Sequence, residues 1–194
     1  MRNFVFCMVL LGALFFAPGT TQAADLSDGA LGVPWGASPA QARQIMEQNG
    51  FTFSNQIVSY TGASGTGFTY KDGFYASYSS TVDIYFINNQ MWTVTVKLFG
   101  GKKTEIFRDL NRLLTEKYGP LTSTVSGAAG DGKAGSGYGT RYDWKDVVAA
   151  GLNIDLVYIS ERQTSSSYIP DSVTVDYVNQ GLYDKLKAQS RQNI

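Results

Sequence analysis

The clearest structural pattern in the chain lies in residues 82–98, VDIYFINNQMWTVTVKL. On each side of Asn88-Asn89-Gln90, apolar residues alternate with mostly polar ones. A period of two is typical of a strand that buries one face and leaves the other in water. The stretch therefore predicts two antiparallel strands, with other elements packed on their apolar side.

Helices are predicted to supply that packing. Ser38-Pro39-Ala40-Gln41 combines an N-cap, a proline at the first helical position and a capping-box glutamine, so a helix should begin at Pro39. It should end at Asn49-Gly50, where glycine can take the left-handed conformation. Apolar residues at helical spacing predict two further helices, over residues 104–118 and about 180–191.

The remaining alternating segments predict more strands. Residues 68–71 and 74–78 flank Asp72-Gly73, a pair that favours a two-residue hairpin turn. Further strands are expected at 141–144, 153–159 and 172–178, with Trp92 and Trp144 in the core. The sequence thus predicts an α+β fold: an antiparallel β-sheet with helices packed on one face. We expect a tandem repeat in the order α-βββ-α-βββ-α, with repeats at about 32–118 and 119–194.

The N-terminal sequence predicts export. Met1-Arg2-Asn3 is followed by an apolar run of about 14 residues, which is too short for a membrane span of about 20. Small residues then predict cleavage of a signal peptide, residues 1–23, near Ala23/Ala24. The only cysteine, Cys7, belongs to this leader, so the remaining single domain, residues 24–194, has no disulfide. Export without disulfides favours the bacterial periplasm.

Composition excludes several kinds of chemistry. The chain has no histidine and no cysteine after Cys7, so triads and metal sites built on these residues are unavailable. Sixteen basic residues balance sixteen acidic ones, which gives no cationic surface for nucleic acid. No cofactor is expected, and neither is a transmembrane span after processing.

The stretch GAAGDGKAGSGYG, residues 127–139, contains two overlapping phosphate-loop patterns. Such loops work by delivering an anion to the N-terminus of a helix. Here Ala134 replaces the hydroxyl residue of a P-loop, and Gly135-Ser136-Gly137 disfavours a helix. We therefore expect a loop between two strands and no nucleotide site, and the same holds for residues 62–67.

Two short motifs carry a resemblance to known proteins. GVPWGAS, residues 32–38, precedes the first helix, and FINNQM, residues 86–91, spans a hairpin. Together they resemble the SmpA/OmlA (BamE-like) outer-membrane assembly proteins and, more loosely, the tandem-repeat beta-lactamase inhibitory proteins. The resemblance covers about residues 32–118. It implies an architecture and a protein-binding role, and it assigns no functional residue.

The candidate binding site is the polar side of the sheet. A sheet face with tyrosine and threonine can serve as a recognition surface, because tyrosine offers contact area at a low entropy cost. The candidate residues are Tyr75, Asp83, Tyr85, Thr93, Thr95 and Lys97. Other carboxylates are scattered singly along the chain, at Asp143, Asp146, Asp155, Asp171 and Asp176. No catalytic or metal-binding residue is predicted.

Three functions remain open at this point. The first is a non-catalytic periplasmic module that binds another envelope protein. The second is a carrier of a lipid, glycan or aromatic ligand in a pocket between helices and sheet. The third is a carboxylate-dependent hydrolase, which requires two acidic side chains to converge.

Overall fold

The computed structural model describes residues 26–59, 65–129, 137–160, 162–163, 168–169 and 171–192. The signal peptide and its cleavage site lie outside these residues. The elements are β1 (Gly29–Ala30), β2 (Val33–Pro34), α1 (Pro39–Gln48), β3 (Thr52–Ser59), β4 (Gly65–Tyr75), β5 (Tyr78–Ile87), β6 (Gln90–Leu98), α2 (Lys103–Tyr118), β7 (Ser123–Ala129), β8 (Gly137–Trp144), β9 (Leu152–Ile159), β10 (Arg162–Gln163), β11 (Tyr168–Ile169), β12 (Ser172–Asn179) and α3 (Gln180–Gln192). No helix in the described part of the chain is long and apolar enough to cross a membrane.

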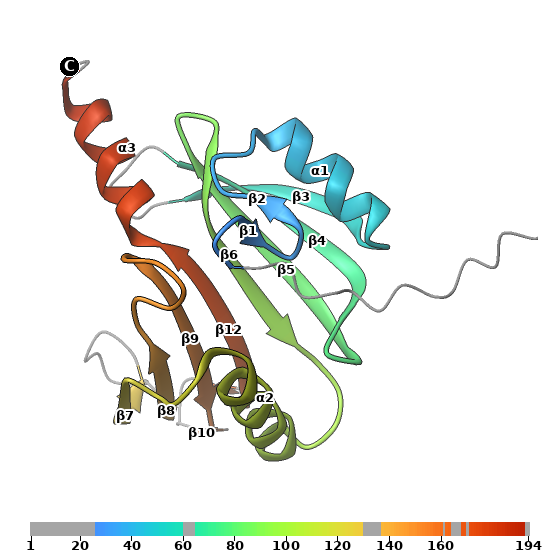
Figure 1. Cartoon of the computed structure of the whole chain (residues 1–194). Coiled ribbons are helices and arrows are strands. Elements are labelled where there is room, and N and C mark those ends of the chain that lie inside the picture. The colour runs from blue at the N-terminus through green and yellow to red at the C-terminus, as the bar shows by residue number, and fades with distance from the viewer. Residues whose placement is uncertain are drawn as a thin grey trace, which may run out of the picture.

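One antiparallel sheet of eight strands organises the molecule (Figure 1). Its strand order is β3-β4-β5-β6-β12-β9-β8-β7, and β12 joins the two halves by pairing with β6. The predicted α+β class with an antiparallel sheet is confirmed. The tandem order α-βββ-α-βββ-α is not supported, because four strands, β3 to β6, lie between α1 and α2. Alternation within strands does not reveal where a further strand such as β3 begins.

The hydrophobic core lies on one face of this sheet. Its central members are fully buried and come from four adjacent strands: Val82, Ile84, Val94, Val96, Leu156 and Val175. Met46 of α1 and Ile106 and Leu110 of α2 belong to the same cluster. In Figure 1, α1 lies over the half of the sheet that contains β3, while α2 lies near β9 and β12.

Helix α3 forms a separate contact at one end of the sheet. Its buried residue, Leu186, lies outside the main core, and so does Ile87 at the end of β5. Ser190 Oγ of α3 also donates a hydrogen bond to Asn88 Oδ1 at the β5–β6 turn. The expectation that helices pack on the core face therefore holds for α1 and α2.

Local signals in the sequence explain the ends of α1 and the β5–β6 hairpin. Ser38 caps α1 through the predicted capping box with Gln41, and Gly50 follows the helix with φ +84°. Asn88 and Asn89 form the hairpin turn with φ values of 50° and 59°. Paired positive φ angles match the right-handed twist of the flanking strands.

Asp72-Gly73 is not the hairpin turn that the sequence predicts. It forms a bulge inside β4, and the turn into β5 falls at Ala76-Ser77, where both φ values are positive. Packing explains the difference, because a Cβ on Gly73 would lie 2.2 Å from Phe51 Cε1. The glycine therefore permits close contact with the Phe51 ring.

The glycine-rich stretch joins two paired strands, as predicted. β7 ends at Ala129, β8 begins at Gly137, and the two strands are antiparallel. A strand rather than a helix follows the glycines, which is incompatible with a phosphate loop. Residues 130–136 themselves lie outside the described residues.

Candidate binding face

The face of the sheet opposite the core carries a continuous row of polar side chains. Directly opposed residues on neighbouring antiparallel strands point to the same face. The pairing register places one polar residue from each of seven adjacent strands in line: Thr69, Asp83, Thr95, Asp176, Asp155, Asp143 and Ser123. We call these seven residues the polar row.

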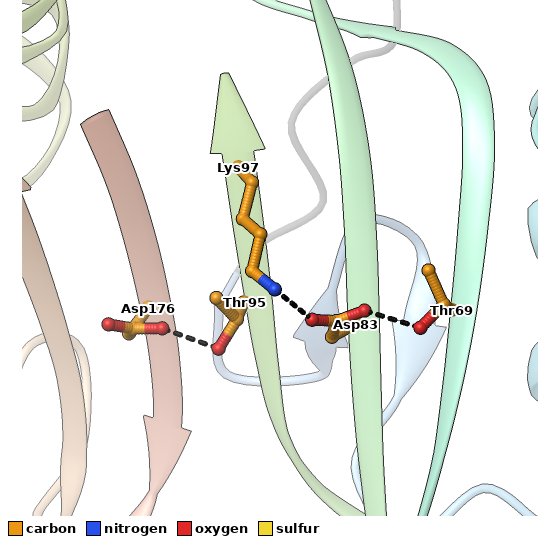
Figure 2. A network of polar contacts seen from close by, with 5 residues as sticks. All are labelled: Thr69, Asp83, Thr95, Lys97 and Asp176. Carbon is orange, nitrogen blue, oxygen red and sulfur yellow. Dashed lines mark hydrogen bonds and ion pairs between the residues drawn. The ribbon is translucent and has the colours of Figure 1, made fainter. Parts of the chain in front are cut away.

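The first part of the row is a hydrogen-bonded network (Figure 2). Asp83 accepts a hydrogen bond from Thr69 Oγ1 at 2.7 Å, and its other oxygen pairs with Lys97 Nζ at 2.7 Å. Thr95 Oγ1 donates to Asp176 Oδ1 on β12. Burial alone would lower the pKa of Lys97, but the hydrogen bond and ion pair with Asp83 outweigh it and raise that pKa.

The far end of the row has a second network. Asp143 is only 1% exposed, accepts a hydrogen bond from Ser123 Oγ at 2.6 Å, and pairs with Arg141 Nε at 2.7 Å. Burial would raise the pKa of Asp143, but the Ser123 and Arg141 contacts together lower it. Asp143 therefore stays ionised to a lower pH than an ordinary aspartate.

Asp155 lies between two other carboxylates. Its position on β9 is directly opposite Asp143 on β8 and Asp176 on β12. Burial, followed by the charge of Asp143, raises the pKa of Asp155 to about 6. Burial also raises the pKa of Asp176, against the opposing effect of the Thr95 hydrogen bond. Asp155 thus carries a proton at a higher pH than an ordinary aspartate.

Five of the six candidate residues lie together on this face. The register pairs Asp83 with Thr95 and Tyr85 with Thr93, and it places Lys97 beside them on β6. They are less exposed than the sequence suggests. Asp83 is 2% exposed and Thr93 is 6% exposed, while Lys97 keeps 47% of its side-chain surface in water.

Tyr75 is the exception, because it lies on the core side. Its hydroxyl hydrogen-bonds to that of Tyr177, a member of the core cluster, and burial raises the pKa of Tyr75 to about 12. The bulge at Asp72-Gly73 explains the error, since it adds one residue to β4 and reverses which face the following side chains take.

The second half of the row is not predicted by the sequence. Asp143, Asp155 and Asp176 are scattered along the chain, but the sheet brings them onto neighbouring strands. A signal was present, since each aspartate is flanked by two apolar residues within a strand, as in Tyr142-Asp143-Trp144. The pairing of β6 with β12, which aligns the two halves, has no comparable signal.

The arrangement limits the chemistry of these carboxylates. Although the acids do converge, Asp83 and Asp143 are covered and already hold a cation each. In the described residues, no group of three or more acidic side chains is placed to hold a metal ion. What the face offers is a surface of hydroxyl, carboxyl and aliphatic groups.

Comparisons with protein-family models, with curated protein sequences and with solved structures give no significant match. The resemblance to BamE-like and inhibitory proteins therefore stays a prediction from short motifs.

Proposed function

We propose that this protein is a non-catalytic binding module of the bacterial cell envelope, exported to the periplasm, that contacts another envelope protein through the polar face of its sheet. The observation that carries this proposal is the polar row, which crosses seven strands in register. Burying carboxylates costs free energy unless they are paired. The hydrophobic core lies on the other face of the sheet, and we infer that the polar row serves binding.

Charge favours a cationic partner. Lys97 and Arg141 are already paired with Asp83 and Asp143. Among the described residues, Asp155 and Asp176 have no ion pair of their own with a lysine or arginine. A partner that presents lysine or arginine side chains would supply the missing positive charge. Half-buried Val157 and Val178 share the face and offer apolar contact beside the acids.

A paired substitution tests the proposal. Thr174 lies on this face opposite Lys97, whereas Thr104 is exposed on α2. The same change, Thr174→Arg and Thr104→Arg, places a bulky cation on each surface in turn. In a pulldown from periplasmic extract, we expect wild type and Thr104→Arg to retain the same protein and Thr174→Arg to lose it. Equal retention by both variants, or no specific protein with wild type, would contradict the proposal.

The alternative functions have less support. A small-molecule carrier was favoured by the aromatic content, but many of these rings pack on one another. Phe68, for example, contacts Phe53 at 5.4 Å and Phe86 at 5.5 Å between ring centroids. A carboxylate-dependent hydrolase needs acids that reach a substrate, and Asp143 is covered by its own partners.

A further inference from the structure

The two edges of the eight-stranded sheet are β3 and β7. Within the described residues, each edge strand presents backbone N–H and C=O groups that no neighbouring strand pairs with. Such edges attract other strands, so proteins protect them with charges, prolines, bulges or covering elements. A comparison of the two edges therefore indicates which of them is available for pairing.

The β3 edge has two of these protections. Its pairing with β4 is interrupted by a bulge between Phe53 and Asn55. The guanidinium of Arg43 from α1 also lies over the Phe53 ring, at 4.5 Å from its centroid. A bulge and a nearby charge both oppose the approach of another strand in register.

The β7 edge has no bulge in its pairing, and Arg141, which lies opposite Val125 on β8, is already paired with Asp143. Ser123–Ala129 pairs with β8 over seven residues without a register shift, and it contains no charged residue and no proline. Thr124, Val125 and Ser126 are exposed. Val125, at 53% exposure, is one of the few large apolar side chains that the described residues leave in water.

We propose that β7 pairs antiparallel with β7 of a second copy of this chain, which joins the two sheets into one. A two-fold axis brings a strand opposite itself, so any charge on it would face the same charge. An uncharged strand avoids this repulsion. Pairing centred near Ser126 makes the two Val125 side chains diagonal neighbours on one face, where each removes the other from water.

The dimer has a consequence for the polar face. Ser123 and Val125 point to that face, in line with Asp143 and Arg141 of β8. An axis perpendicular to the sheet keeps both polar faces on the same side of the dimer. Two copies of the face would then be presented together, and a partner with two contact points would bind more tightly than to one copy.

Two matched substitutions test the pairing. Val125→Lys places a charge beside the two-fold axis, and Phe74→Lys makes the same kind of change at a residue that is 67% exposed near the β4–β5 turn. By sedimentation velocity, we expect wild type and Phe74→Lys to dimerise. We expect Val125→Lys to need at least about tenfold higher concentration. Circular dichroism checks that all three proteins are folded.

Hydrogen exchange of wild type provides a second readout that needs no variant. Amides of β7 should gain protection as the protein concentration rises through the dimerisation midpoint, while those of β3 should not. The proposal would be overturned if the wild-type protein stays monomeric at a concentration about 100-fold above the one used in the pulldown. Dimerisation that Val125→Lys leaves unchanged, or concentration-dependent protection at β3 instead of β7, would also overturn it.

Discussion

The same strands build both faces of the sheet, but different interactions stabilise the side chains on each face. On the core face, Val82 and Val96 pack with aliphatic neighbours, and this burial is favourable whatever their detailed orientation. On the polar face, Asp83 and Asp143 are as deeply buried as core residues, but each depends on specific donors. Burial by itself therefore does not identify the core of this protein. The core face stabilises the fold, whereas the polar face holds charges in place at a cost.

The largest expected effect comes from the core face. Trp144 is 1% exposed and donates a hydrogen bond from Nε1 to the carbonyl of Gly119. We expect Trp144→Ala to lower the free energy of unfolding by about 3–5 kcal/mol, because it leaves a cavity and an unpaired carbonyl. Urea denaturation measures this. A loss under about 1 kcal/mol would mean that Trp144 does not pack as described.

The bulge in β4 offers the next test, because it decides which face Tyr75 takes. Gly73→Ala forces a methyl group into the Phe51 ring, and we expect a loss of about 1–3 kcal/mol. In a Phe51→Ala background, the same change should cost much less, since the ring is gone. A double-mutant cycle by urea denaturation checks this coupling. Equal costs in both backgrounds would show that the contact is not what requires glycine.

The polar face predicts a gain in stability from removing a charge. Asp155 lies between two carboxylates, so we expect Asp155→Asn to raise the free energy of unfolding at pH 7.5 by about 1 kcal/mol after solvent screening. Asp146→Asn, at an exposed residue after β8, is the control and should change little. A loss of stability in Asp155→Asn would contradict the account of this row.

The gain in the free energy of unfolding from Asp155→Asn should depend on pH. Folding raises the pKa of Asp155 from 3.8 to about 6, so the folded state binds the proton more tightly. Its contribution to stability is present below pH 3.8 and is lost as the pH rises through about 6. The difference between the variant and wild type should therefore grow between about pH 4 and 7. A constant difference would show that Asp155 has an ordinary pKa.

The smallest expected change in stability comes from removing a buried hydroxyl group. Tyr70 is fully buried on the core face, and its hydroxyl has no hydrogen-bond partner among the residues that the structure describes. Burial raises its pKa to about 12. We expect Tyr70→Phe to change the stability by less than about 1 kcal/mol, or to increase it, because it removes a polar group without a partner. A larger loss would mean that the hydroxyl is bonded in solution.

Local features were the most predictable part of this structure. The capping box at Ser38, the end of α2 at Gly119-Pro120 and the Asn88-Asn89 turn each depend on a few neighbouring residues, and all are found near their predicted positions. The strands at 153–159 and 172–178 were equally clear, because alternation is also a local property.

Features that depend on distant residues were not predictable. Phe51 makes Asp72-Gly73 a bulge instead of a turn, and this places Tyr75 on the core side. The pairing of β6 with β12 aligns Asp83 with carboxylates more than 50 residues away in sequence, as the register from Asp83 to Asp143 demonstrates. A single sequence contains the alternation of each strand but not the order of strands in the sheet.

The aspartates of the polar row share one electrostatic environment, which carboxyl ¹³C NMR titration can measure residue by residue. Asp155→Asn and Asp143→Asn serve to assign the signals. The account predicts that Asp155 titrates near pH 6 and Asp143 below its ordinary range. It also predicts that Asp155 shifts downward in Asp143→Asn. Titration of both residues near pH 3.9, each unaffected by loss of the other, would contradict the account.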